Sequence, residues 1–144
     1  MRQRGFTIIE MMIVIAILGI LVAAIYPLIG NTGARDVDNA ARELATDLQW
    51  LQQISKNSGG GTLPNITFTT IAPAGYTIQQ GATIIKPSVS LPSSVTLTVT
   101  STTFSFDAAG KCSANTTITL QGGSVSRFVI IESNGRIRIS TTSP

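Results

Sequence analysis

The feature that most constrains this chain is an apolar run near its N-terminus, from Phe6 to Ile29. As a helix rising about 1.5 Å per residue, a run of this length can cross a hydrocarbon core of roughly 30 Å. Its only charged residue is Glu10. Arg2 and Arg4 precede it, and positive flanks favour the cytoplasmic side of a membrane. We therefore expect residues 6–29 to span the inner membrane, with the C-terminal bulk in the periplasm.

Two simpler explanations of this segment stay open. A secretory signal peptide would have a shorter apolar region and then a small-residue cleavage site, and no such site follows this run. A plain signal anchor would explain the length of the run but not Glu10. A carboxylate within an apolar helix is costly unless it lies at the interface, near the positive end of the helix dipole, or has a partner.

A second, amphipathic helix is expected over residues 30–57. Apolar residues recur there every three or four positions, which is the spacing of one helix face. Gly59–Gly61 should end the helix. This apolar stripe predicts that the helix packs against a sheet. The alternative is that the stripe packs in a groove with a partner. It consists of Val37, Ala41, Leu44, Leu48 and Leu51, widened by Ala40, Ala45 and Ile54.

The remainder, residues 58–144, is rich in Thr, Ser and Gly and is expected to form a β-rich head. Asn134-Gly135 between two alternating runs indicates a two-residue hairpin turn. We predict an α+β fold in which the long N-terminal helix packs against an antiparallel sheet, with residues 30–144 as one globular domain. The expected strands are Ile66–Ile71, Tyr76–Gln80, Thr83–Lys86, Val95–Thr100, Thr103–Asp107, Thr116–Gln121, Ser126–Glu132 and Arg136–Thr141.

The segment Arg4-Gly5-Phe6-Thr7-Ile8-Ile9-Glu10-Met11-Met12-Ile13-Val14 resembles the processing site of type IV prepilins and type II secretion pseudopilins. The resemblance implies that prepilin peptidase removes a leader, residues 1–5, by cleaving after Gly5. It also implies N-methylation of Phe6 and a role for Glu10 in assembly with other pilins or pseudopilins in a filament. A carboxylate at Glu10 could neutralise the ammonium group of a neighbouring subunit within the apolar filament core.

The head resembles the GspH/FimT type of minor pseudopilins and minor pilins. The resemblance rests on Leu44–Gln49, Phe104–Asp107 with Gly110, and Gly135–Arg138. It implies a minor subunit of a type IV pilus or, as the alternative, of a type II secretion system. The single cysteine, Cys112, has no partner in the chain for the C-terminal disulfide of many major pilins. It is either buried and inert or paired with another chain.

Three arginines near the C-terminus suggest a second role. With a two-residue turn at Asn134-Gly135, strand alternation would place Arg127, Arg136 and Arg138 on one exposed face, where guanidinium groups suit phosphates. In the FimT branch a G-R-x-R motif is associated with DNA binding in natural transformation, and Gly135–Arg138 matches it. Few aromatic side chains are present to stack bases, which favours duplex DNA. The simpler alternative is charge protection of an edge strand.

Composition argues against catalysis. The chain has no His and one Cys, so the usual metal-ligand clusters and hydrolase triads are unavailable. We expect no cofactor, no metal, no small-molecule substrate and no enzymatic activity. The expected partners are prepilin peptidase, other pilins, the inner membrane and double-stranded DNA. The expected location is the inner membrane and then a pilus or pseudopilus at the cell surface.

Overall fold

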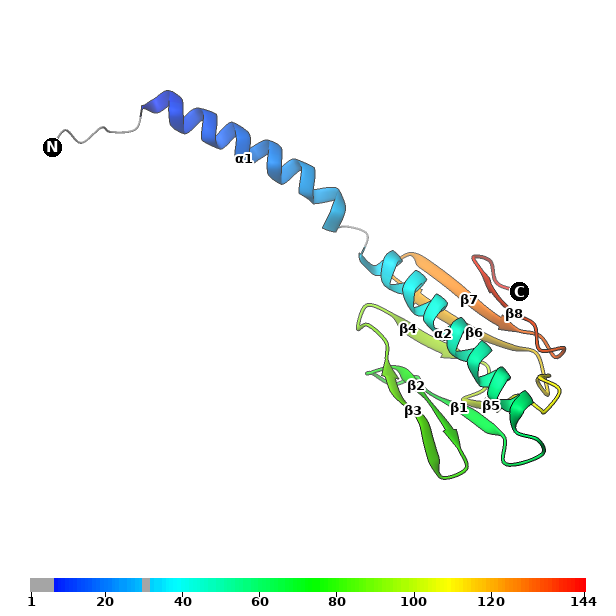
Figure 1. Cartoon of the computed structure of the whole chain (residues 1–144). Helices are drawn as coiled ribbons and strands as arrows, with labels where there is room; N and C mark the ends of the chain where they lie inside the picture. The colour runs from blue at the N-terminus through cyan, green and yellow to red at the C-terminus, as the bar shows by residue number, and fades with distance from the viewer. Residues whose placement is uncertain (1–6, 30–31) are drawn as a thin grey trace. The chain divides into compact units, whose positions relative to one another are not determined.

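The structure is a computed structural model that describes residues 7–29 and 32–144. The chain divides into two compact units, Met1–Thr32 and Gly33–Pro144. The described part of the first unit is mainly one helix, α1 (Ile8–Ile29), drawn in blue in Figure 1. Helix α1 is long and apolar enough to cross a membrane over Ile8–Ile25. The described residues therefore include a helix with the length and apolar composition expected of a membrane span.

Helix α2 (Thr32–Asn57) lies in the second unit from its second residue, Gly33, onward. Its predicted apolar stripe is confirmed, because all five stripe residues from Val37 to Leu51 are buried, together with Ala40 and Ala45. Ile54 is half-buried. The helix ends just before Gly59 and Gly60, whose positive φ angles of 56° and 88° are compatible with glycine but not with helix continuation.

Eight strands follow α2, and each overlaps a strand expected from the sequence. The largest difference is in β3, which continues through Pro87 although the pattern predicted an end at Lys86. Proline is tolerated there because β3 is the edge strand of its sheet. The strands are β1 (Pro64–Thr69), β2 (Gly75–Gln80), β3 (Thr83–Ser90), β4 (Thr96–Val99), β5 (Thr103–Ser105), β6 (Thr116–Gly122), β7 (Val125–Ile131) and β8 (Ile137–Ser140).

The strands form two four-stranded sheets, in the orders β3-β2-β1-β5 and β4-β6-β7-β8. Every strand pairing is antiparallel. One hydrophobic core joins α2 to both sheets, with members such as Leu48 from the helix, Ile78 from β2 and Ile118 from β6. Figure 1 shows α2 lying along both sheets. The α+β fold with an antiparallel head is thus confirmed.

Close packing between α2 and the second sheet depends on Gly122. A Cβ atom at this position would lie 2.6 Å from the Val37 side chain and 2.9 Å from the Gly33 carbonyl oxygen. Only a glycine lets the N-terminal turns of α2 approach the end of β6 this closely. This contact sets the position of α2 over the second sheet, and with it the positions of the charged residues on that helix.

Candidate functional site

The first turn of α1 holds Glu10 in a capping box. The Glu10 carboxylate accepts hydrogen bonds of 3.0 Å from both the backbone N–H and the hydroxyl of Thr7, and the Glu10 N–H donates to the Thr7 hydroxyl at 3.3 Å. This is the reciprocal pattern that satisfies exposed donors at a helix start. The single subunit therefore offers Glu10 a local partner. The expected cleavage and methylation sites, Gly5 and Phe6, lie outside the described residues.

Beyond Glu10, α1 is apolar on all sides. Its large side chains from Ile8 to Ile25 are exposed in the single chain. A helix without a polar face cannot remain in water and must be covered by lipid or by other apolar helices. The arrangement of one acidic residue at the start of such a helix suits both a membrane anchor and a packed filament core.

The β7–β8 hairpin differs from its predicted register by one residue. Ile131 pairs with Ile137, and Ile130 pairs with Arg138, whereas the predicted two-residue turn would have placed Ile131 opposite Arg138. The Gly135 N–H donates to the Glu132 carbonyl at 2.8 Å, and the Glu132 N–H donates to the Arg136 carbonyl at 2.9 Å. The loop therefore has three residues, with Gly135 at φ 88°.

The turn type explains this correction. A two-residue type I′ turn needs a positive φ at both central residues. Among residues 7–29 and 32–144, only glycines have a positive φ, so Asn134 does not adopt the required conformation. Its side chain instead accepts a 2.8 Å hydrogen bond from the Arg136 N–H. The Asn-Gly pair marked the hairpin correctly but not its loop length.

This register separates the three arginines that were expected on one face, so that expectation was wrong. Arg127 pairs with Leu120 and shares the inner face with buried Val129, while Arg138 pairs with Ile130 on the outer face. Ile137 likewise lies on the inner face, opposite Ile131. A shift of one residue reverses the face of each side chain, because strand side chains alternate with a period of two.

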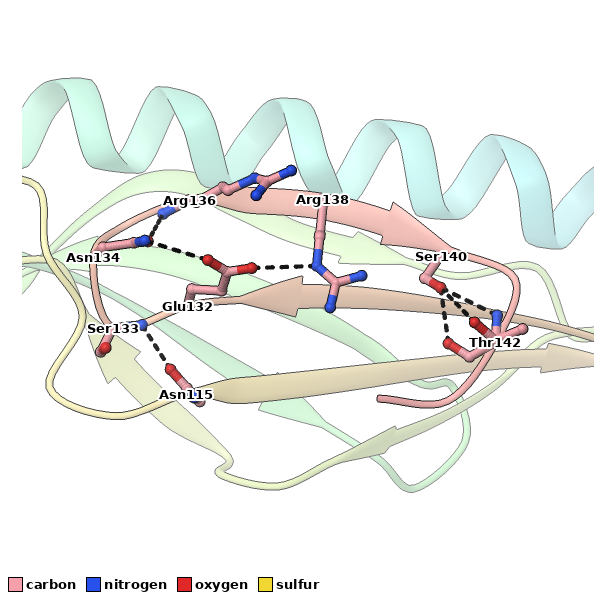
Figure 2. A network of polar contacts seen from close by, with 8 residues as sticks. All are labelled: Asn115, Glu132, Ser133, Asn134, Arg136, Arg138, Ser140 and Thr142. Carbon is pink, nitrogen blue, oxygen red and sulfur yellow. Dashed lines mark hydrogen bonds and ion pairs between the residues drawn. The ribbon is translucent and has the colours of Figure 1, made fainter.

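Arg136 and Arg138 remain near one another at the β7–β8 turn, but their side chains differ in setting. The Arg138 Nε donates to the Glu132 carboxylate at 3.3 Å, with 40% of the Arg138 side chain exposed. Arg136 is exposed and has no ion pair among the described residues. Figure 2 shows Arg138 reaching across the sheet toward Glu132, whereas Arg136 points along the edge of β8.

Ion pairing also reduces the free positive charge of the head. Lys86 binds Asp47 and Arg127 binds Asp38, and both carboxylates belong to α2. In the described part of the chain, Lys111 and Arg136 are the only cations of the strand region without a carboxylate within 4.0 Å. Within the strand region, the aromatic residue outside the Phe-patterned strands, Tyr76, is buried and offers no surface for base stacking.

The glycine of the G-R-x-R motif has a packing role. A Cβ atom at Gly135 would lie 2.0 Å from the Gly110 carbonyl oxygen. The Gln52 amide of α2 donates to the Gly110 carbonyl at 2.6 Å and to the Gly135 carbonyl at 2.8 Å. Gln52 therefore holds the β5–β6 loop and the β7–β8 turn together, and sequence reasoning did not identify it. In the sequence, the position of Gln52 next to Leu51 of the apolar stripe was only a weak signal of this role. The structure shows that Gln52 is half-buried.

A polar cluster of buried Asp47 and Tyr76 with half-buried Lys86 was also missed. The Tyr76 hydroxyl donates to the Asp47 carboxylate at 2.5 Å, and the Lys86 ammonium contacts both carboxylate oxygens at 2.5–2.6 Å. Burial, together with the Asp47 hydrogen bond and charge, raises the pKa of Tyr76 above its usual value. The signal was present in the sequence, because Asp47 falls between Leu44 and Leu51 on the apolar face of α2.

Cys112 is buried, and its N–H donates to the Ser133 carbonyl at 3.2 Å. Its sulfur has no disulfide partner among the described residues. Within residues 7–29 and 32–144, no group of three or more His, Cys, Asp or Glu side chains is placed to hold a metal ion.

Residues 1–26 match the family described as the prokaryotic N-terminal methylation motif. The match includes Gly5, Phe6 and Glu10 and ends within α1, before the head. This motif indicates a pilin- or pseudopilin-type protein. It implies processing by prepilin peptidase and assembly with other pilins. Comparisons with curated proteins and with solved structures give no match to this chain.

Proposed function

We propose that this chain is a minor pilin of a type IV pilus, a non-catalytic subunit of the GspH/FimT type. In this proposal prepilin peptidase cleaves after Gly5, Phe6 becomes N-methylated, and α1 passes from the inner membrane into a filament. The observation that carries the proposal is the methylation motif joined to an apolar helix whose only charge is Glu10. A minor pseudopilin of a type II secretion system is the second candidate, because that class shares the same motif.

The capping box adds a step to assembly. In the free subunit the Glu10 carboxylate is hydrogen-bonded to Thr7. In the filament it would exchange these bonds for the methylated ammonium group of Phe6 in a neighbouring subunit. A buried carboxylate beside an ammonium is stable only when both charges are present and hydrogen-bonded. The charge of Glu10 would therefore favour correctly placed subunits over lone ones.

Processing and assembly can be tested together. The full chain is expressed with prepilin peptidase, and its intact mass is expected to show loss of residues 1–5 and gain of one methyl group. Glu10→Ala should be cleaved normally but enter filaments poorly, whereas Glu10→Asp should retain part of the assembly. An uncleaved wild-type chain, or normal assembly of Glu10→Ala, would contradict the proposal. Incorporation into pili or into secretion pseudopili in a host with both systems distinguishes the two candidates.

We also propose that the β7–β8 turn binds duplex DNA through Arg136 and Arg138. The support is local: Arg136 is exposed and without an ion pair among the described residues, and Arg138 shares its guanidinium with one carboxylate at 3.3 Å. Arg127 is left out of this surface, because it lies on the inner face of β7. The binding would be independent of sequence and steeply weakened by salt, because it rests on phosphate contacts.

The measurement is a gel shift of the full chain in neutral detergent with duplex DNA across a salt series. The double variant Arg136→Gln/Arg138→Gln should bind more weakly, with a salt slope reduced by about 2, since each lost phosphate contact removes about 0.9. Arg35→Gln removes an exposed cation near the start of α2, at the opposite end of that helix from Gln52 and the turn, and is the matched control. Equal binding by the double variant and the wild type would assign these arginines to protection of the sheet edge.

A further inference from the structure

A polar pocket lies where α2 meets the end of the second sheet. It has a volume of about 370 Å³ and is lined by Asp38 and Arg42 from α2, Arg127 from β7, and Ile139 and Thr141 at the end of β8. These residues come from α2 and from the β7–β8 hairpin, which are far apart in sequence. All of them belong to the unit Gly33–Pro144, so the pocket is a feature of one compact body.

The Arg127 guanidinium in this pocket is held in place from two sides. Its Nε lies 2.6 Å from an Asp38 carboxylate oxygen in an ion pair, and its Nη1 donates to the Ser126 carbonyl at 3.0 Å. Only 24% of the side chain is exposed. A planar guanidinium fixed in this way has further N–H groups in a defined orientation, and less conformational entropy is lost when a ligand binds to it.

Arg42 brings a second guanidinium to the same pocket. It lies one helical turn after Asp38, is exposed, and has no carboxylate within ion-pair distance in the described part of the chain. With one carboxylate and two guanidinium groups, the lining carries a net charge of one positive unit. Asp38 already forms an ion pair with Arg127. The excess positive charge is therefore that of Arg42, on the part of the pocket that Arg42 and Thr141 border.

From this arrangement we propose that the pocket binds a phosphate group. Arginine forks match the oxygen spacing of phosphate, and charge-assisted hydrogen bonds to phosphate are strong. The Thr141 hydroxyl adds a neutral donor. A cation is disfavoured by the net positive charge. Both a phospholipid headgroup and free phosphate present the same chemistry. The site is separate from the DNA surface, because Arg127 and Arg138 lie on opposite faces of the sheet.

The test is a calorimetric titration of the full chain in neutral detergent with sodium phosphate, at constant ionic strength against chloride. Saturable binding is expected for the wild type. Arg42→Gln should weaken it about tenfold, as expected for the loss of one charged hydrogen-bonding partner. Arg127→Lys keeps the charge beside Asp38 but loses the fork, and it should weaken binding as well. Arg136→Gln is the control and should bind phosphate as the wild type does.

Micelles containing phosphatidylglycerol, compared with micelles containing uncharged diacylglycerol, identify the source of the ligand. If the headgroup occupies the pocket, phosphatidylglycerol lowers the apparent affinity of the wild type for free phosphate. If free phosphate is the ligand, the affinities for phosphate measured in the two kinds of micelle agree. The proposal is overturned if phosphate gives no saturable binding beyond chloride, or if Arg42→Gln and Arg127→Lys both bind as the wild type does. Unfolding midpoints show whether each variant is folded.

Discussion

At the scale of single residues, the charge on Asp47 is accommodated inside the head by two partners. Tyr76 is almost fully buried and donates its hydroxyl to Asp47, while Lys86 reaches the same carboxylate from the edge strand β3. A buried charge is tolerated only when it is paired and hydrogen-bonded, because desolvation otherwise exceeds what the fold can offset. This cluster connects α2 to the first sheet.

Tyr76→Phe is expected to destabilise the head by about 1 kcal/mol at pH 7, the typical net value of a lost hydrogen bond. The difference should shrink in alkali. The Tyr76 pKa is raised above the ordinary value of 10.0, so the folded state keeps its proton while the unfolded state loses it above that pH. The wild type therefore has this stability in full below pH 10 and loses it as pH rises further.

Urea unfolding of both forms between pH 7 and pH 11 measures this effect. A constant difference in unfolding free energy across that range would show that the Tyr76 hydroxyl titrates normally. Comparing the two proteins at each pH cancels the titration of the lysines, which they share.

Gly135 is the second residue whose role follows from its surroundings. Gly135→Ala should destabilise the head by about 3 kcal/mol or more, because strain at positive φ adds about 1–2 kcal/mol to a clash with the Gly110 carbonyl. Gly123→Ala is the matched control, since Gly123 also has a positive φ, 61°, but a Cβ there would meet nothing within 4 Å. Equal losses of unfolding free energy for the two variants would mean that only φ matters at Gly135.

At the scale of elements, α2 determines how the two sheets are combined. Its inner face packs on both sheets, and three of its polar residues, Asp38, Asp47 and Gln52, each hold a different part of the head. The sheets are otherwise built from separate sets of four strands. The packing of α2 should therefore contribute more to stability than either hairpin taken alone.

Leu48→Ala, in the centre of the inner face, is expected to cost about 2–5 kcal/mol of unfolding free energy, as large-to-small changes in a core do. The adjacent Gln49 is exposed on the same helix. Gln49→Ala should therefore change the free energy of unfolding by less than about 0.5 kcal/mol. Chemical denaturation measures both. A small effect of Leu48→Ala would show that the sheets hold together without α2.

At the scale of the whole molecule, the chain joins two units that need different surroundings. Helix α1 is apolar, and its residues 8–25 are exposed, whereas the buried core of the described residues, from Val37 to Ile131, lies within Gly33–Pro144. The methylation motif belongs to the first unit, and both proposed phosphate-binding surfaces belong to the second. The proposed roles in assembly and in ligand binding therefore belong to separate parts of the chain.

A fragment of residues 32–144 should fold without α1 and without detergent. We expect it to unfold in one cooperative transition, with a thermal midpoint close to that of the full chain, because residues 8–25 of α1 are exposed and none of them belongs to the core. Circular dichroism and calorimetry on the two proteins test this. A fragment with helix and strand content but no cooperative transition would show that α1 is needed for the packing of the head.

Local patterns in the sequence predicted much of this molecule by themselves: the apolar N-terminal helix, the inner stripe of α2 and the positions of all eight strands. These depend on residue type and spacing within a few neighbouring positions. The methylation motif is likewise contiguous in the chain. Only the tertiary structure decided the faces and partners of the charged residues. Arg127 lies on the inner face, where it pairs with buried Leu120, and one extra loop residue places Arg138 on the opposite face. The carboxylates that pair with Arg127 and Lys86, Asp38 and Asp47, come from a helix distant in sequence.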